Sequence, residues 1–246
     1  MAVDDEYAAG MPVMQRGQHA LVTGAGSGIG RAIALALAAE GVRVTLVGRD
    51  AAKLGAVAVE AGGEAALVAA DLATEEGIAT VAEAAGPILH LLVHSAGRHV
   101  RGPVGSLSLA EWQQLDAINL HAPMRLTAAC LGRLQAAGGQ IVVVNSTVVL
   151  HAAPNVAAYA AGKQALKAAT DALRQEVNAS GVRVISVYPG RTDTPMQTGI
   201  LAAEGRVASA GGLMRPADVA LMVVAALKLP ATAEVTDIVM RAMRPV

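Results

Sequence analysis

The chain has 246 residues, of which 54% are hydrophobic, 16% charged and 2% aromatic, and its formal net charge is −1. A near-neutral charge without a long basic run argues against a nucleic-acid-binding protein. Glycine, proline or charge interrupts every apolar stretch before it reaches the roughly 18 residues of a membrane span, so we expect no membrane partner.

The single cysteine, Cys130, excludes an intramolecular disulfide and is typical of a protein of the reducing cytoplasm. The N-terminus carries acidic residues instead of the basic region that begins a secretory signal. We therefore expect a cytoplasmic protein. Residues 1–17 mix acids with glycine and proline, and we interpret them as a flexible N-terminal extension ahead of a single domain over residues 18–246.

Short apolar runs alternate with longer amphipathic segments from residue 19 onward. The runs predict strands at residues 19–23, 42–48, 65–70, 88–94, 141–146, 182–188 and 235–240. The amphipathic segments predict helices at residues 28–40, 50–61, 74–85, 108–136, 156–179 and 216–227. Asp50 and Thr74 are suitable N-caps for two of these helices, and Pro123 predicts a kink in the long fourth one.

This alternation predicts an α/β fold, because strands linked by helices pair in parallel and place the helices on both faces of the sheet. The expected architecture is a single-domain, Rossmann-like, doubly wound parallel sheet of about seven strands. In such sheets the ligand lies beyond the carboxyl ends of the strands. The residues that come directly after the first, fourth, fifth and sixth strands are therefore the candidates for chemistry.

A glycine-rich turn follows the first strand and opens the first helix. Glycines allow the backbone to approach a pyrophosphate, whose charge is stabilised by the N-terminus of the helix. A glycine cluster can also be only a tight turn, but its place between a strand and a helix favours a dinucleotide site. The candidate cofactor-binding residues here are Gly24, Ser27, Gly28, Ile29 and Gly30.

Tyr159 and Lys163 are one helical turn apart and share a helix face. A tyrosine of ordinary pKa is a poor proton carrier at neutral pH, whereas a neighbouring ammonium lowers that pKa and suits the phenol to acid–base catalysis. Ser146 ends the preceding predicted strand and would face the same cleft, where its hydroxyl can orient a substrate oxygen. By itself, Ser146 can equally be a hydroxyl that forms a local turn.

The TGxxxGxG turn, Ser146, the Tyr159–Lys163 pair and the Pro189–Gly190 turn occur in the order typical of short-chain dehydrogenases/reductases, and the chain resembles that family from Thr23 to Thr194. The resemblance implies four catalytic residues, Asn119, Ser146, Tyr159 and Lys163, with Asn119 holding a water that links Lys163 to solvent. It also implies cofactor contacts from Asp71, Leu72, Ser95, Ala96, Gly97, Tyr159, Lys163, Pro189, Gly190, Thr192 and Thr194. Asp71 can instead be a helix cap, and Asn119 an ordinary surface residue.

The end of the second strand predicts the cofactor. An acid that would bind the ribose 2′-hydroxyl of NAD is replaced by Gly48, and Arg49 can pair with the 2′-phosphate of NADP. Arg49 can also be a solvated strand end, and Ser27 stands where many NADP enzymes of the family carry a second basic residue. We expect NADP(H), with NAD(H) as the alternative.

The expected activity is NADP(H)-dependent interconversion of a ketone or aldehyde and an alcohol. An NAD-dependent alcohol dehydrogenase of the same family and a non-catalytic dinucleotide-binding sensor or scaffold are the alternatives. His94 stands where the family usually has asparagine, and we interpret it as structural. No spacing of His, Cys and acids suggests a metal site.

Residues 195–215, which are rich in glycine, are expected to form a mobile substrate lid with an apolar side. A small, largely apolar carbonyl compound or its alcohol suits such a pocket. Arg98, Arg101 and Arg191 are candidate carboxylate anchors, although solvated roles fit them equally well. Because small residues line the helix after residue 156, and the family commonly pairs this helix and the one over residues 108–136 with symmetry mates, we expect a homodimer or homotetramer.

Overall fold

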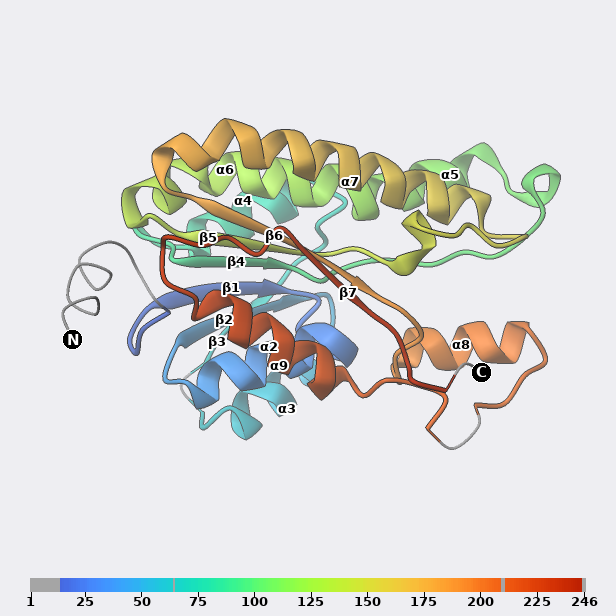
Figure 1. Cartoon of the computed structure of the whole chain (residues 1–246), viewed down its shortest axis with the longest axis horizontal. Helices are drawn as coiled ribbons and strands as arrows, with labels where there is room; N and C mark the ends of the chain where they lie inside the picture. Colours follow the sequence, from blue (N-terminus) through green and yellow to red (C-terminus); the bar gives the residue numbers. More distant parts are fainter. Residues whose placement is uncertain (1–13, 64, 209–210, 245–246) are drawn as a thin grey trace, which may run out of the picture.

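A computed structural model describes residues 14–63, 65–208 and 211–244 (Figure 1). Its strands form one parallel sheet in the order β3-β2-β1-β4-β5-β6-β7. The strands are β1 (His19–Thr23), β2 (Arg43–Gly48), β3 (Ala66–Ala69), β4 (Leu91–His94), β5 (Gln140–Val144), β6 (Arg183–Pro189) and β7 (Asp237–Met240). The expected doubly wound, Rossmann-like sheet is confirmed, and the strand order reverses between β1 and β4.

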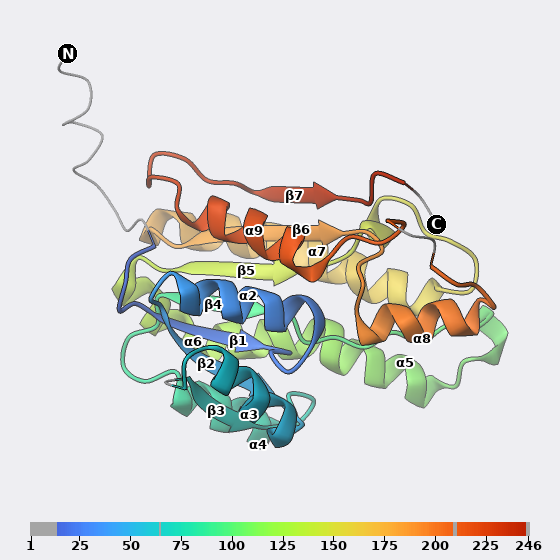
Figure 2. The same cartoon turned by 90° about the horizontal axis from the view of Figure 1, so that it is seen from below.

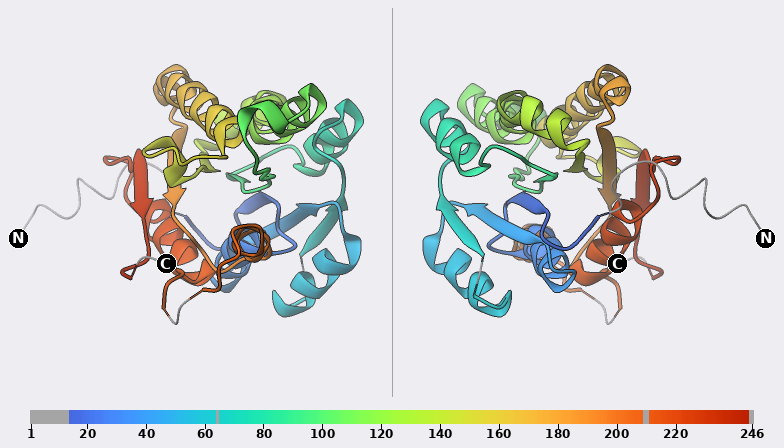
Figure 3. Two further views of the ribbon diagram at one scale, coloured as in Figure 1. Left: turned by 90° about the vertical axis from the view of Figure 1, so that its right-hand side faces the viewer. Right: turned by 90° about the vertical axis from the view of Figure 1, so that its left-hand side faces the viewer.

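Helices cover both faces of this sheet (Figures 1 and 3). One face carries α2 (Gly28–Ala39), α3 (Ala51–Glu60) and α9 (Pro216–Leu227), and the other carries α4 (Glu75–Ala84), α5 (Leu109–Asp116), α6 (Ala122–Ala137) and α7 (Ala157–Val177). A further helix, α8 (Pro195–Ala203), lies beyond the carboxyl ends of the strands (Figure 2). Short turns of helix complete the elements: η1 (Val104–Ser106), η2 (Ala117–His121), η3 (Thr147–Val149) and η4 (Asn178–Ser180).

Alternate residues of each central strand enter two separate cores. In β1, Ala20 and Val22 pack with α2, α3 and α9, while Leu21 packs with α4, α6 and α7 on the other face. In β4, Val93 packs in the first of these cores and Leu92 in the second. Since side chains of a strand point alternately to opposite faces, a strand covered on both faces must be apolar throughout.

The long helical region expected over residues 108–136 is present as an uninterrupted run from Leu109 to Ala137. It comprises α5, the π-helical turn η2 and α6. Proline has no N–H, so Pro123 cannot donate to the carbonyl of Asn119 as an α-helix requires. In the wide turn before it, the Ala122 N–H bonds the Ala117 carbonyl, which is i→i+5 pairing. Pro123 thus perturbs the turn that precedes it.

The two predicted N-caps are confirmed. The Asp50 side chain accepts from the Lys53 N–H at the start of α3, and the Thr74 hydroxyl accepts from the Gly77 N–H at the start of α4. Several predicted strand boundaries shift by one to three residues. Among them, β4 begins at Leu91, β5 ends at Val144, before Ser146, and β6 continues through Pro189.

Of the proposed N-terminal extension, residues 1–13 lie outside the described residues. Met14, the next residue, is 6% exposed and belongs to the core cluster of α2 and α9. Gly17 donates to the Gly41 carbonyl. The packed structure therefore includes residues 14–17, which the sequence pattern assigns to the extension. None of the described helices combines the length and the apolar character that crossing a membrane requires.

Candidate active site

A cleft of about 380 Å³ opens at the carboxyl ends of the strands, where the strand order reverses. Segments far apart in the sequence meet there, including the turns after β1, β4, β5 and β6 and the first turns of α7 and α8. Most of the predicted site residues line this cleft: Gly24, Ser27, Gly28, Ile29, Gly30, Ser95, Ala96, Gly97, Asn119, Ser146, Tyr159, Lys163, Pro189, Gly190, Thr192 and Thr194.

The glycine turn is shaped for close backbone approach. Gly24 has φ of +67° and Gly28 has φ of +55°, a region that residues with a side chain rarely adopt. A Cβ atom on Gly24 would lie 2.8 Å from the Ala96 backbone, and one on Gly30 would lie 2.4 Å from the Gly24 carbonyl oxygen. Ser27, the N-cap of α2, makes no capping bond with its side chain. The N-terminal N–H groups of α2 are thus suited to bind a phosphate, and the turn fits a dinucleotide.

Thr23 fastens this turn to the end of β4. Its hydroxyl donates to the Val93 carbonyl at 3.2 Å and accepts from the backbone N–H groups of Ser95 and Ala96 at 3.0 and 3.2 Å. Ser95 and Ala96 are therefore held beside Gly24 by Thr23, the first residue of the TGxxxGxG turn, for which the sequence pattern predicts no such contact.

The loop after β6 closes against the same turn. A Cβ atom on Gly28 would lie 2.9 Å from the Thr194 methyl carbon, so any side chain at Gly28 would displace the loop. The Thr194 hydroxyl accepts from the Gln197 N–H as the N-cap of α8 and retains its own proton for donation. The Thr192 hydroxyl donates to the Gly190 carbonyl at 3.0 Å. These contacts fix the loop across the cleft from α7.

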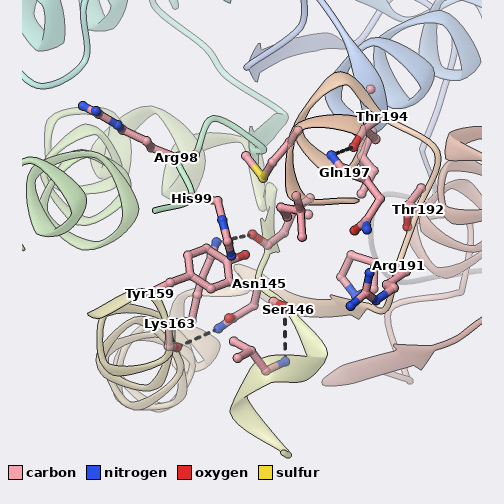
Figure 4. Close-up of a pocket in the computed structure, with 18 of the residues that line it drawn as sticks. Arg98, His99, Asn145, Ser146, Tyr159, Lys163, Arg191, Thr192, Thr194 and Gln197 are labelled. Carbon is pink, nitrogen blue, oxygen red and sulfur yellow. Dashed lines mark hydrogen bonds between the residues drawn. The ribbon is translucent and has the colours of Figure 1, made fainter. Parts of the chain in front are cut away.

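Tyr159 points into the cleft beside Ser146 and His99 (Figure 4). Its ring centroid is 4.7 Å from that of His99, and the two planes are tilted by 59°. Burial raises the pKa of the Tyr159 phenol, and a hydrogen bond with the Ser146 side chain opposes this rise. The expectation of a lowered pKa is thus not met in the protein alone, because removal from water disfavours the phenolate.

Lys163 is 4% exposed, and its Nζ lies 6.0 Å from the Tyr159 ring centroid. The ammonium donates to the Val144 carbonyl at 3.0 Å, while the Asn145 side chain donates to the Lys163 carbonyl at 3.1 Å. Burial lowers the pKa of Lys163 to about 8. The end of β5 thus holds both the head group and the backbone of this lysine, and Asn145 is a contributor that the sequence reasoning missed.

Asn119 lies in η2 and is 1% exposed, so the alternative of an ordinary surface residue is excluded. Its side-chain oxygen accepts from the Arg98 N–H at 3.0 Å, and its side-chain nitrogen donates to the Arg98 carbonyl at 2.8 Å. The side chain therefore holds the segment after β4 at the wall of the cleft.

His94, at the end of β4, is buried and its Nε2 lies 2.8 Å from the Thr127 hydroxyl oxygen of α6. Burial lowers the pKa of His94 to about 3, so the ring is neutral at physiological pH. The expected structural role is supported, because this contact joins the sheet to its helix layer.

Three predicted cofactor residues lie outside the lining of the cleft. Arg49 and Asp71 are exposed at the ends of β2 and β3, and Leu72 is 6% exposed in the second core. The Asp71 carboxylate accepts from the Ala73 N–H at 3.0 Å, as a turn-forming aspartate does. Across residues 14–63, 65–208 and 211–244, His, Cys and acidic side chains form no group of three that could hold a metal ion.

The wall of the cleft that faces Tyr159 and Lys163 is more polar than the sequence indicated. Glu204, directly after α8, is bound by Arg191 and Arg101, and all three side chains line the cleft. The sequence reasoning named both arginines but did not identify Glu204, because no local pattern brings a residue beyond α8 to the loops after β4 and β6.

Comparison with known proteins agrees with this geometry. The sequence profile described as short chain dehydrogenase matches residues 18–205. An uncharacterized oxidoreductase of Staphylococcus epidermidis is 31% identical over 227 residues, covering 90% of this chain and 96% of the relative.

Two solved structures show the same architecture. A putative NAD(P)-dependent gluconate 5-dehydrogenase from Beutenbergia cavernae, with bound NADP, has a TM-score of 0.81 and 36% identity, covering 93% of this chain and 97% of the other. A 3-ketoacyl-(acyl-carrier-protein) reductase from Brucella melitensis, complexed with NADH, has a TM-score of 0.83 and 28% identity, covering 94% and 99%. With the profile match, these likenesses show that the chain belongs to the short-chain dehydrogenase/reductase family of oxidoreductases.

Proposed function

We propose that the protein is an NADP(H)-dependent oxidoreductase that interconverts a ketone or aldehyde and an alcohol. The observation that carries this proposal is the meeting of Ser146, Tyr159 and Lys163 with the glycine turn in one cleft. A bound nicotinamide would supply or accept the hydride. The residues of the chain would bind the cofactor, orient the substrate and transfer the proton to or from the substrate oxygen.

Tyr159 is the proposed acid–base residue. In carbonyl reduction its hydroxyl would donate a proton to the substrate oxygen, and in alcohol oxidation its phenolate would accept one. Ser146 would donate a hydrogen bond to the same oxygen and hold it beside the phenol. Lys163 would stabilise the phenolate. Because its pKa is lowered to about 8, it could also pass a proton between Tyr159 and solvent. A water held near Asn119 is proposed to link Lys163 to solvent.

The choice of NADP(H) rests on the end of β2. Gly48 has no carboxylate to bind a ribose hydroxyl, and a Cβ atom there would lie 3.3 Å from the Leu54 side chain. Arg49 is exposed and makes no ion pair with any described residue, so its guanidinium is available for a 2′-phosphate. Asp71 and Leu72 are proposed to contact the adenine.

We also propose that the protein is located in the cytoplasm.

A turnover screen tests the function. Ketones, aldehydes and alcohols of graded size are assayed with NADPH, NADH and their oxidised forms. Tyr159→Phe should lower kcat by about 100-fold or more, since general acid–base catalysis contributes that much. The variant should bind the cofactor as tightly as the native protein does, because Phe retains the ring beside His99. Cofactor binding without turnover of any compound by the native protein would contradict the proposal and favour a sensor or scaffold.

A further inference from the structure

A buried carboxylate and two arginines form a charged group in the wall of the cleft. Glu204 has a side chain only 8% exposed, and its Oε1 lies 2.9 Å from Nη2 of Arg191 and 3.2 Å from Nη1 of Arg101. Its Oε2 lies 2.8 Å from the same Arg191 nitrogen. Arg101 comes from the segment after β4 and Arg191 from the loop after β6, so two separate parts of the fold converge on one carboxylate.

The balance of charge in the cleft as a whole is positive. Among the described residues that line the cleft, Glu204 is the sole acid, against Arg98, Arg101, Lys163 and Arg191. One carboxylate neutralises only one of the two arginines that bind it. In addition, Nη1 of Arg191 is buried and has no hydrogen-bond partner among the described residues. A buried guanidinium donor without an acceptor is costly, and a second anionic oxygen would remove that cost.

His99 connects this group to the proposed reaction centre. The ring of His99 contacts Tyr159, and the charges of Arg101 and Glu204 both reach it. Burial lowers the pKa of His99, and the positive charge of Arg101 lowers it further. The His99 ring is therefore neutral near pH 7 and does not compete with the arginines for an anion. Figure 4 shows Tyr159 and His99 on one side of the pocket and Arg191 on the other. A small molecule between them could place a carbonyl at Tyr159 and an anionic end at Arg191.

We propose that Arg191 and Arg101 form a carboxylate-binding subsite, which Glu204 occupies until substrate arrives. This inference rests on the proposed function and names its substrate class: small oxo acids and the corresponding hydroxy acids. The substrate carboxylate displaces that of Glu204 and takes the same guanidinium donors, because the two groups have the same charge and geometry. Neutral ketones cannot make this exchange.

The position of Glu204 at the end of a helix allows its carboxylate to move away from Arg191 and Arg101. It follows the last residue of α8, and Gly205, with φ of +62°, comes directly after it. The segment is fixed at its base, where Asp193 donates to the Met214 carbonyl and Met214 donates to the Arg191 carbonyl. Rotation at the end of α8 would therefore move Glu204 and leave the Arg191 backbone in place.

Matched pairs of ketones provide the test. Pyruvate, acetoacetate and 4-oxopentanoate are each compared with their methyl esters, using NADPH, and the readout is the ratio of kcat/KM for acid over ester. This ratio is insensitive to damage that affects both members of a pair. We expect it to exceed one for at least one pair. Ratios below one for all three pairs would overturn the subsite and leave the proposed function standing.

Three substitutions assign the effect to residues. Arg191→Gln should lower the ratio by about tenfold or more, the usual value of a charged hydrogen bond. Glu204→Gln keeps the shape and one acceptor but removes the competing charge, so the ratio should rise by about threefold or more. Arg206 has the same charge but approaches Glu204 only to 3.9 Å and does not line the cleft. Arg206→Gln is thus the matched control and should change the ratio by less than about twofold.

A ratio that Arg191→Gln leaves unchanged would show that Arg191 and Glu204 only close the wall of the cleft. If no ketone is turned over at all, the proposed function fails, and calorimetry with 4-oxopentanoate and the NADP⁺-loaded protein decides about the subsite. Binding that is tighter than that of the methyl ester and is lost in Arg191→Gln would support it. Equal binding of acid and ester, or no binding of the acid, would overturn it.

Discussion

Lys163 shows at the scale of one residue how burial changes the chemistry of a side chain. Its spacing from Tyr159 on the helix is evident in the sequence, but its surroundings are not. The structure holds its Nζ against the Val144 carbonyl and lowers its pKa to about 8. The ammonium of Lys163 therefore loses its proton at a lower pH than that of an exposed lysine does.

The pH dependence of stability should report this buried lysine. Its pKa is about 8 in the folded chain and near 10.5 when unfolded, so the unfolded state holds more protons between these values. The free energy of unfolding therefore rises with pH between about pH 8 and 10.5, as the buried lysine loses its charge. Below that window the cost of burying the charged lysine is present in full. Between pH 7 and 10 the native protein should gain up to about 3 kcal/mol of unfolding free energy relative to Lys163→Met, measured by urea denaturation. A difference that does not vary with pH would contradict the lowered pKa.

Arg49 makes the cofactor prediction testable at a single position. Arg49→Gln should weaken NADPH binding about tenfold, because a charge-assisted contact with the 2′-phosphate is lost, and should leave NADH binding within about twofold. Fluorescence titration with both nucleotides measures this. Arg125→Gln, on the distant α6, is the control. Tighter binding of NADH than NADPH by the native protein would instead favour NAD(H).

Residues in local motifs could be predicted, and residues joined only by the fold could not. The glycine turn and the pair on α7 are recognisable because their chemistry depends on short spacings. The group of Arg101, Arg191 and Glu204 has no such spacing, since the three residues come from separate loops that only the sheet order brings together. In the sequence, Arg101 and Arg191 are therefore only two candidates among several.

At the scale of elements, the α5–η2–α6 segment shows how a backbone defect positions a side chain. The π turn adds one residue to a helical turn, because each N–H bonds the carbonyl five residues back instead of four. Asn119, inside this turn, bonds both backbone groups of Arg98. The proline gives grounds to predict a kink, but a π turn depends on how the backbone pairs once the α-helical donor is missing.

Removing these two bonds should be costly. Asn119→Ala would remove both side-chain bonds to the Arg98 backbone, which are partly buried, and should lower the free energy of unfolding by about 1–3 kcal/mol. Gln113→Ala, an exposed change on the neighbouring α5, should cost no more than about 0.5 kcal/mol. Chemical denaturation of both variants gives the comparison. Equal stabilities would mean that the Arg98 segment finds other partners.

At the scale of the whole molecule, α7 presents a surface that suits self-association. Ala161, Ala168 and Ala172 are exposed along this helix, and small side chains allow a second helix to approach closely. Leu109, on the adjacent α5, is 73% exposed. These observations support the proposed homodimer or homotetramer.

Light scattering coupled to size-exclusion chromatography measures this assembly. The native protein should elute with the mass of a dimer or tetramer, and Ala168→Arg should shift it toward the monomer, since a large charged group would separate the paired helices. Ala56→Arg, at an exposed position of α3 on the opposite face of the sheet, tests whether any added charge has the same effect. A monomeric native protein would refute the prediction.

The place of β1 in the sheet has a consequence during synthesis of the chain. β1 pairs with β2 on one side but with the much later β4 on the other, and α2 packs against α9, the last helix of the described chain. A nascent chain therefore carries an uncovered apolar surface on α2 until residue 227 has left the ribosome. A chain interrupted before α9 would display that surface permanently and become a client of chaperones or a seed for aggregates.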